Sequence, residues 1–351
     1  MGKGRKIHLI LIIIIFILGY ILYSQINDGA EFQILKLEER KEWLANDRRP
    51  YMNSINENVY VNTHLYDQLS ETAKIIYANI YENSENLKSG TYKIEFENAF
   101  KNILEEENGS EKLSKEYQSA IEAITYENPE LFYYDVTKMY INIEKITRLV
   151  GNKYNVYISD NSETGEGYLA DGFYGKEDID KCQNEIEEIR DKILKNIEGK
   201  NEIEKIKYIH DYLIDTIEYD TTLQQSNIYN IYGALVLKKS VCEGYAKALQ
   251  YLLSSAGIEN VIVSGTATNS NGITENHAWN YVKIDEEWYA IDATWDDPVI
   301  IGGGKLPNKL KYQYFLKGSN TIDKNHFASK KFTQNGKEFE YPTLSKTDYD
   351  I

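Results

Sequence analysis

One of the two cysteines in this 351-residue chain lies where a helix is expected to begin, and a histidine and an aspartate follow it. Cys242 stands in "KKSVCEGYAKALQYLL", His277 in "ENHAWNYVKI" and Asp292 in "WYAIDATWDDP". An imidazole beside a thiol can take its proton, and a carboxylate on the far ring nitrogen fixes the tautomer and stabilises the imidazolium. We therefore take Cys242, His277 and Asp292 as candidate nucleophile, base and orienting acid.

The segment around Cys242 predicts a helix whose first turn contains the cysteine. Ser240 and Glu243 fit an S-x-x-E capping box with Ser240 as the N-cap, and apolar residues follow at helical spacing as far as Gly257. Free amide groups and the positive end of the helix dipole lower the pKa of a thiol. Glu243 acts against this, because a neighbouring carboxylate disfavours a second negative charge, so we expect a compensating cation.

The segment that carries His277 and Asp292 predicts two alternating strands joined by a tight turn at residues 285–287. His277 opens the first strand and Asp292 lies in the second. Simple pairing across the turn places His277 opposite residues near Asp296, about four residues from Asp292. A bulge, a stagger or a strong twist would close this gap. Failing these, Asp296 or Asp297 becomes the orienting acid.

Three motifs in this order, "SVCEGYAKAL", "NHAWNYVKI" and "WYAIDATWDDP", resemble the transglutaminase-like superfamily, whose papain-like core carries a Cys-His-Asp triad. The upstream stretches "IHDYLIDTIEYD" and "YNIYGALVLKKSVC" are similar to the helix and lead-in before the nucleophile in bacterial members. The resemblance covers residues 202–298 well and the region before residue 150 only loosely. It implies that Cys242 is the nucleophile, His277 the base and Asp292, in preference to Asp296, the orienting carboxylate.

The expected fold is α+β, with a transglutaminase-like core in which the helix carrying Cys242 packs on an antiparallel sheet. A helix-rich accessory region precedes this core. The predicted divisions are a signal anchor, a stalk helix, the accessory region with a small strand pair and the transglutaminase-like domain, at residues 1–25, 26–49, 50–198 and 199–351. The tail after residue 306 is expected to complete the sheet or to pack over it.

Helical periodicity and strand alternation locate the accessory elements. Apolar residues at helical spacing predict helices within residues 70–87, 111–132, 177–197 and 202–217. Alternation between residues 133 and 158 predicts a strand pair.

The remaining cysteine and histidines have simpler interpretations. Cys182 is expected to be a buried, inert thiol, and a disulfide to Cys242 is disfavoured because it would occupy the thiol that has a histidine partner. His210 falls on the apolar stripe of its helix and is expected to be a packed core residue. His326 has no role that the sequence identifies. No metal and no cofactor are expected, because the five histidines form no zinc-type spacing with the cysteines.

The N-terminus combines basic residues with an apolar run. Lys3, Arg5 and Lys6 precede an uncharged run at residues 7–23, which at ~1.5 Å per residue gives roughly 26 Å, near the lower limit for a membrane span. The positive-inside rule predicts that the chain after Ser24 is exported. The sequence "YILYSQIND" lacks the small residues of a cleavage site, so an uncleaved membrane anchor is expected.

The net charge and the candidate chemistry limit the classes of molecule that the protein is expected to bind. A formal net charge of −16 argues against nucleic acid, which requires an excess of clustered Lys and Arg. The expected partners are the membrane, through the N-terminal helix, and a protein or peptide substrate such as a cell-envelope component.

The expected activity is extracytoplasmic hydrolysis of peptide or amide bonds through a cysteine thioester. Members of the superfamily cross-link proteins or cleave peptides and amides, so the resemblance does not fix the reaction. The alternatives are a cross-linking acyl transferase with the same triad and a non-enzymatic surface module. A triad argues against the last, because binding alone needs no thiolate–imidazolium pair.

Catalysis also requires an oxyanion hole. The backbone amide of Cys242 is one candidate donor, and the hydroxyl of Tyr232 is a second, although Tyr232 suits a core position equally. Trp279 and Trp295 either shield the ion pair from water or pack against the sheet.

Overall fold

The computed structural model describes residues 62–149, 151–160, 165–297, 308–333 and 336–350. The predicted anchor at residues 1–25 and the predicted stalk helix at residues 26–49 lie outside the described residues. Within the described ranges, no helix is both long enough and apolar enough to cross a bilayer.

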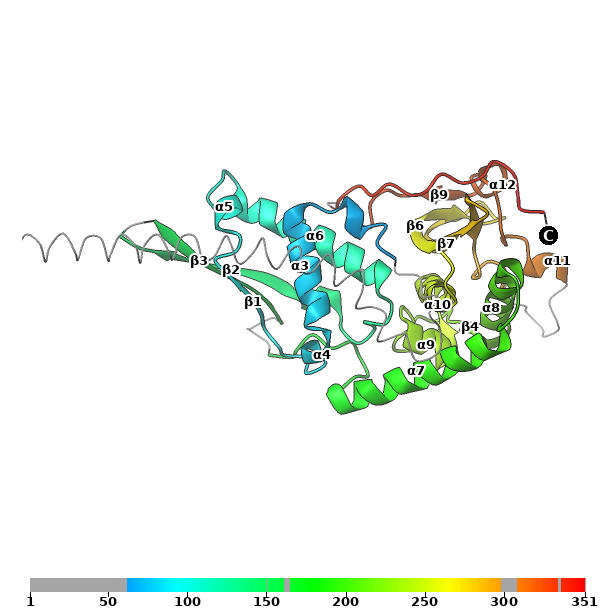
Figure 1. The fold of residues 1–351 in the computed structure, drawn as a ribbon, viewed down its shortest axis with the longest axis horizontal. Coiled ribbons are helices and arrows are strands. Elements are labelled where there is room, and N and C mark those ends of the chain that lie inside the picture. Colours follow the sequence, from blue (N-terminus) through cyan, green and yellow to red (C-terminus); the bar gives the residue numbers. More distant parts are fainter. Residues whose placement is uncertain (1–61, 150, 161–164, 298–307, 334–335, 351) are drawn as a thin grey trace, which may run out of the picture.

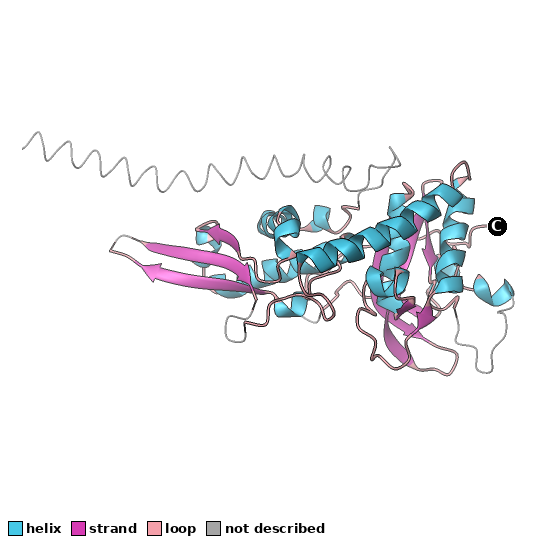
Figure 2. Ribbon diagram, turned by 90° about the horizontal axis from the view of Figure 1, so that it is seen from below, coloured by secondary structure: helices cyan, strands magenta, loops and turns pink. Residues whose placement is uncertain are grey.

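Helices and a small sheet form the N-terminal region. In chain order the elements are η1 (Tyr66–Gln68), α3 (Glu71–Glu82), α4 (Ser84–Leu87), β1 (Ile94–Glu97), α5 (Lys101–Leu104), α6 (Gly109–Glu127), η2 (Val136–Lys138), β2 (Tyr140–Thr147) and β3 (Asn152–Ser159). Figure 2 shows the β2–β3 hairpin projecting from one end of the molecule.

A larger sheet and its covering helices form the C-terminal region. Its elements are α7 (Lys176–Asn196), α8 (Glu202–Thr216), β4 (Glu218–Tyr219), α9 (Ile231–Leu235), β5 (Lys239–Ser240), α10 (Cys242–Ser255), β6 (Asn260–Thr268), β7 (Thr274–Ile284), β8 (Glu287–Ile291), α11 (Asn308–Lys311), α12 (Ser319–Ile322) and β9 (His326–Ala328). Figure 1 shows α7 running along one side of the molecule between the two ends.

The helices predicted from periodicity are confirmed, and side-chain caps explain where two of them, α3 and α8, begin. The Ser70 hydroxyl accepts a hydrogen bond from the Ala73 amide at 3.1 Å and starts α3. At α8, Asn201 and Glu204 form a capping box. The predicted strand pair is β2–β3, which pair in antiparallel register. The sheet has a third strand, β1, that the sequence analysis does not predict. The strand is only four residues long, so its alternation is too short to stand out.

The predicted arrangement of a cysteine-bearing helix on an antiparallel sheet is also confirmed. The main sheet has the order β8-β7-β6-β9, and each neighbouring pair is antiparallel. Ala246 of α10 packs against Ile262 and Ala278 on the sheet. The Asn280 side chain donates a hydrogen bond to the Ala246 carbonyl oxygen at 3.0 Å. This bond joins α10 directly to the centre of the strand that carries His277.

The C-terminal tail completes the sheet, as predicted. Its strand β9 pairs along the outer edge of β6, with His326 opposite Ala267. Strand β6 leaves no space for a side chain at Gly265, where a Cβ atom would overlap the Phe327 carbonyl oxygen and lie 2.8 Å from the Trp279 ring. Glycine at this position therefore allows the tail to approach the sheet closely.

A continuous core connects the two regions. The largest cluster of buried apolar side chains includes Ile76 of α3, Ile124 of α6 and Leu252 of α10. Helices on both sides of the boundary predicted at residue 198 contribute to it, through Ile193 and Ile206. The accessory region and α10 therefore share one hydrophobic core.

We expect Gly265→Ala to weaken the attachment of β9 to the sheet. The added methyl group must displace either the tail backbone or the Trp279 ring, at a cost of about 1–3 kcal/mol in free energy of unfolding. Urea titration measures this loss. Ser264→Ala, one residue earlier in β6, is the control and should change stability by less than about 0.5 kcal/mol. Equal stability of the two variants would show that β9 does not pack as described.

Candidate active site

Cys242 is the first residue of α10, but the predicted capping box is wrong. Val241 is the N-cap residue and makes no side-chain capping bond. Ser240 instead belongs to β5, which pairs with β4, and its buried hydroxyl donates to the Ile228 carbonyl oxygen at 2.7 Å. Glu243 forms an ion pair with Lys247 at 2.6 Å, so Lys247 is the compensating cation that the sequence required. The thiol still lies at the positive end of the helix dipole.

The register of β7 and β8 brings Asp292 closer to His277 than the sequence suggested. The connecting turn contains only Asp285 and Glu286, both with positive φ, as a tight two-residue hairpin turn requires. The last pair joins Asn280 to Ile291. Extending this register by one step places Asp292 opposite Trp279, two residues from His277 and on the same face. Diagonal neighbours of this kind lie within reach of each other, and no bulge interrupts the β7–β8 ladder.

The three candidate residues come together where the N-terminal end of α10 meets the sheet: Cys242 on the helix, His277 on β7 and Asp292 directly after β8. The Nε2 atom of His277 lies 2.7 Å from Oδ2 of Asp292. The Cys242 thiol interacts with the same imidazole, and because Nε2 is bound to Asp292, Nδ1 is the nitrogen available to the thiol. His277 and Asp292 are buried, whereas Cys242 is partly exposed. The thiol is therefore the member of the set that a substrate can reach.

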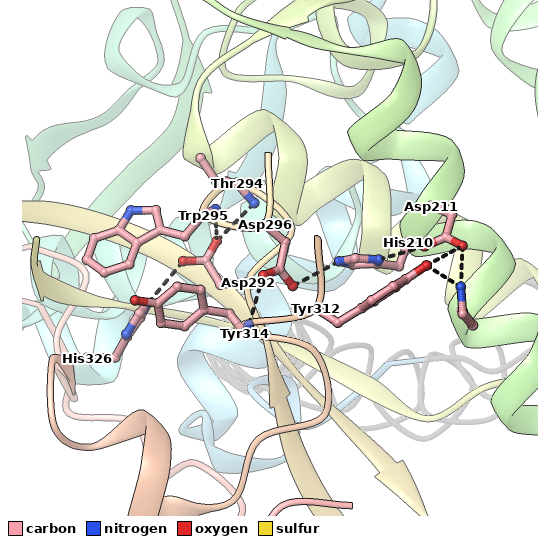
Figure 3. Close-up of polar contacts among 10 residues, drawn as sticks. His210, Asp211, Asp292, Thr294, Trp295, Asp296, Tyr312, Tyr314 and His326 are labelled. Atoms are coloured by element: carbon pink, nitrogen blue, oxygen red, sulfur yellow. Dashed lines mark hydrogen bonds and ion pairs between the residues drawn. The ribbon is translucent and has the colours of Figure 1, made fainter. Parts of the chain in front are cut away.

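Two backbone amides fix the Asp292 carboxylate from its other side. Its Oδ1 atom accepts hydrogen bonds from the Thr294 amide at 3.0 Å and the Trp295 amide at 3.1 Å (Figure 3). Burial raises the pKa of Asp292, but the neighbouring His277 and the hydrogen bonds lower it by more, so the pKa falls well below its ordinary value. Asp292 is therefore an anion in the folded protein.

The two alternative orienting acids are engaged elsewhere. Asp296 binds Nε2 of His210 at 3.1 Å, and burial, partly offset by His210, raises the pKa of Asp296 to about 6 (Figure 3). Asp297 accepts a hydrogen bond from the Tyr245 hydroxyl at 2.7 Å. His210 is fully buried, which confirms its core position. Both contacts hold the turn after Asp292 against α8 and α10.

The charges around His277 favour its protonated form. Burial lowers the pKa of His277, but the Asp292 carboxylate and the Cys242 thiol raise it by more, to about 10. An imidazolium at neutral pH is the partner that a thiolate needs. The site therefore places an imidazolium, supported by a carboxylate, beside the Cys242 thiol.

Two tryptophans flank the imidazole. The ring of Trp279 lies 6.0 Å from that of His277 and is nearly fully buried, and the partly exposed ring of Trp295 lies at 5.3 Å. Each also contributes to packing, so the two interpretations of these residues are compatible. By excluding water, the rings strengthen the electrostatic interactions of the pair.

Tyr232 does not serve as the predicted second oxyanion donor. Its hydroxyl donates to Glu185 at 3.3 Å and interacts with the thiol of Cys182, both on α7. Both cysteines are free thiols, but Cys182 is buried, and burial raises its pKa. Tyr219 is another tyrosine near the nucleophile, because β4 pairs its Cα with that of Ser240, two residues before Cys242.

Tyr219 also interacts electrostatically with Cys242, the candidate nucleophile. Burial, followed by the neighbouring Cys242 and Glu275, raises the pKa of Tyr219 to about 12. Its hydroxyl therefore keeps its proton at neutral pH and remains a hydrogen-bond donor. The sequence offered no signal for Tyr219, since two-residue strands show no alternation.

The structure adds a residue for which the sequence showed no role. His326 of β9 is buried, and its Nε2 atom lies 3.0 Å from Oδ2 of Asp292 (Figure 3). Ligand atoms of His277, Asp292 and His326 lie within 4.8 Å of one another, and two imidazoles with a carboxylate are ligands that zinc accepts. The separations of 2.7 and 3.0 Å are also ordinary hydrogen-bond distances, which account for this cluster without an ion.

A helix bearing a thiol at its first residue, packed on an antiparallel sheet that supplies histidine and aspartate, defines a papain-like thiol site. Residues 191–293 match the sequence model of the transglutaminase-like superfamily. The chain therefore carries a transglutaminase-like domain, as the three motifs indicated.

Similar proteins share only part of their length with this chain. Kyphoscoliosis peptidase of Mus musculus is 25% identical over 146 residues, which are 38% of this chain and 22% of the mouse protein. The Homo sapiens protein of the same name is 24% identical over 149 residues, with the same coverage. The chain thus spans about a fifth of the length of these relatives.

Two solved structures are similar in fold at low sequence identity. A crystal structure of a TGase is 15% identical, with 49% of this chain and 48% of that chain covered and a TM-score of 0.30. The periplasmic domain of TgpA from Pseudomonas aeruginosa is also 15% identical, with 41% and 56% covered and a TM-score of 0.26.

The shifted pKa of His277 predicts a pH-dependent contribution to stability. Because the folded pKa of about 10 exceeds the ordinary value of 6.5, the contribution is complete below pH 6.5 and is lost as the pH rises through 10. The difference in free energy of unfolding between the wild type and His277→Gln should therefore shrink from pH 6 to pH 10. Denaturant titration at several pH values measures it, and a constant difference would contradict a protonated His277.

Proposed function

We propose that the protein is an extracytoplasmic thiol hydrolase that cleaves peptide or amide bonds through a thioester on Cys242. The observation that carries this proposal is the position of His277, between the Cys242 thiol on one ring nitrogen and the Asp292 carboxylate on the other. This order of three groups gives both an activated nucleophile and a proton donor for the leaving amine.

The residues divide the reaction between them. The Cys242 thiolate attacks the carbonyl carbon of the substrate, and the protonated His277 then gives its proton to the leaving amine nitrogen as the C–N bond breaks. Water attacks the resulting thioester while His277 takes one of its protons, which releases a carboxylic acid and returns the thiolate and the imidazolium. Asp292 stays ionised throughout and stabilises the charged ring.

Two donors are available for the negative oxygen that develops on the attacked carbonyl. The backbone amide of Cys242 is among the first four of α10, which have no partner within the helix. The neutral Tyr219 hydroxyl is the second donor that we assign, since β4 places it beside the nucleophile.

A peptide or protein substrate is proposed from two kinds of support. The partly exposed thiol suits a carbonyl presented at the surface of a larger molecule. The relatives from mouse and human bear the name peptidase, although the similarity covers only part of each chain. Hydrolysis and transfer to an amine share the thioester, so the nature of the product separates them.

Export of the catalytic domain is part of the same proposal. Its support is the sequence of the N-terminus, where basic residues precede the apolar run at residues 7–23. In intact cells, added protease should digest the domain containing Cys242, whereas a cytoplasmic marker stays protected. Protection of both until the cells are lysed would exclude the proposed location.

The thiolate–imidazolium pair can be detected without knowing the substrate. In the full-length chain, Cys242 should be alkylated rapidly well below pH 8, and His277→Gln should slow this reaction roughly a hundredfold at pH 6 because the imidazolium that stabilises the thiolate is removed. Peptide mass spectrometry follows Cys242 with the buried Cys182 as internal control. Alkylation of Cys242 that does not depend on His277 would exclude the proposed chemistry.

The assignment of Tyr219 predicts a separate kinetic effect. With a peptide ester or amide that the enzyme turns over, Tyr219→Phe should lower kcat roughly a hundredfold and change KM little, because the bond forms only as charge develops. The rate of Cys242 alkylation, which needs no oxyanion hole, should stay near that of the wild type. Tyr232→Phe, whose hydroxyl binds Glu185, is the matched control. Equal kcat values for the two variants would remove Tyr219 from the oxyanion hole.

A further inference from the structure

One carboxylate oxygen near the nucleophile serves two histidines. Oδ2 of Asp292 lies 2.7 Å from Nε2 of His277 and 3.0 Å from Nε2 of His326. With the two backbone amides on Oδ1, the carboxylate has four hydrogen-bond partners, about as many as it has lone pairs to offer. His326 lies on β9, a strand separate from the β7–β8 hairpin.

We propose that His326 is a positioning residue for the thiol site: it donates a hydrogen bond to Asp292 and thereby keeps the carboxylate turned toward His277. The inference rests on the proposed function of Cys242, His277 and Asp292, and adds a fourth member to that set. Without His326, Oδ2 would lose one of its two donors inside a site from which water is largely excluded, and the carboxylate would be free to turn.

The environment of His326 fixes the direction in which its ring points. The Nδ1 atom lies 2.8 Å from the side-chain oxygen of Asn325, and the Asn325 amide nitrogen donates to the Tyr314 hydroxyl at 3.1 Å. The rings of Trp295 and Trp279 lie 4.7 and 5.1 Å from the His326 ring, in edge-to-face arrangement. Each ring nitrogen thus faces a side-chain oxygen, Nδ1 that of Asn325 and Nε2 that of Asp292, and an imidazole with a proton on both nitrogens donates to both.

The same tail segment also supports the backbone of Asp292. The Asp292 amide donates to the Tyr314 carbonyl oxygen at 3.1 Å, and the Tyr314 amide donates to Asp296 at 2.8 Å (Figure 3). The tail thus contacts the acid-bearing turn through both the main chain and the His326 side chain. Removing the imidazole alone tests the second contact while the first remains.

Two substitutions separate a hydrogen bond from simple packing. His326→Gln keeps an N–H donor close to the position of Nε2, and His326→Leu fills similar space without any donor. Ile186→Ala, in the buried part of α7 and remote from the site, controls for general destabilisation. All variants are made in the full-length chain, and their thermal unfolding is measured beside the wild type.

The primary measurement is the rate of Cys242 alkylation as a function of pH. At pH 6, His326→Leu should lower the rate roughly ten- to a hundredfold, because a misoriented Asp292 no longer supports the imidazolium that stabilises the thiolate. His326→Gln should restore most of the rate, and Ile186→Ala should leave it unchanged. The low-pH limb of the profile should shift toward higher pH only in His326→Leu.

Four outcomes would overturn the inference, the last of them together with the proposed function. If His326→Leu matches the wild type while His277→Gln is slow, the proposed function stands and His326 has no positioning role. If His326→Gln and Ile186→Ala lose as much reactivity as His326→Leu, the effect is one of stability. If a chelator alters the reactivity of Cys242 in the wild type and zinc restores it, the three ligand atoms hold a metal in place of the hydrogen bonds. A wild-type rate in His277→Gln would instead exclude the proposed function together with the inference.

Discussion

The buried carboxylate of Asp292 imposes the main physical constraint on this structure. Its side chain is 1% exposed, and an ionised carboxylate in that position is tolerated only when each oxygen receives hydrogen bonds or faces a positive charge. Two backbone amides and two imidazoles meet this requirement. The supporting groups come from the hairpin, the turn that follows it and the tail, so these segments must fold together for the charge to be buried.

The turn after Asp292 shows how the fold protects this arrangement. Its two further aspartates bind His210 of α8 and Tyr245 of α10, which lie on separate helices. These contacts hold the turn in the conformation that aims the Thr294 and Trp295 amides at Oδ1. Three aspartates within six residues, which would repel one another in solution, are thus each held by different partners.

The thiol side of the site is simpler and depends on α10. The helix presents Cys242 at its positive end, and the Glu243–Lys247 ion pair reduces the effect of the adjacent carboxylate. Support comes from the sheet, through Ala246 and Asn280, and from the accessory region, through the shared core. An accessory region of this kind positions the nucleophile by packing, without contributing a group to the proposed chemistry.

The sequence by itself determined the residues whose order and surroundings are local: the helix that begins at Cys242, the hairpin that carries His277, and the long helices, because periodicity and turn residues act over a few positions. It misjudged the cap of α10, since Ser240 is held by pairing of β5 with the distant β4. It also misjudged the hairpin register by a single turn residue, which left the choice among three aspartates open. Only the tertiary structure decided that His326 meets Asp292 and that Tyr219 lies beside the nucleophile. Those contacts join segments that are far apart in the chain and that strand pairing brings together. Local sequence patterns do not predict such pairing.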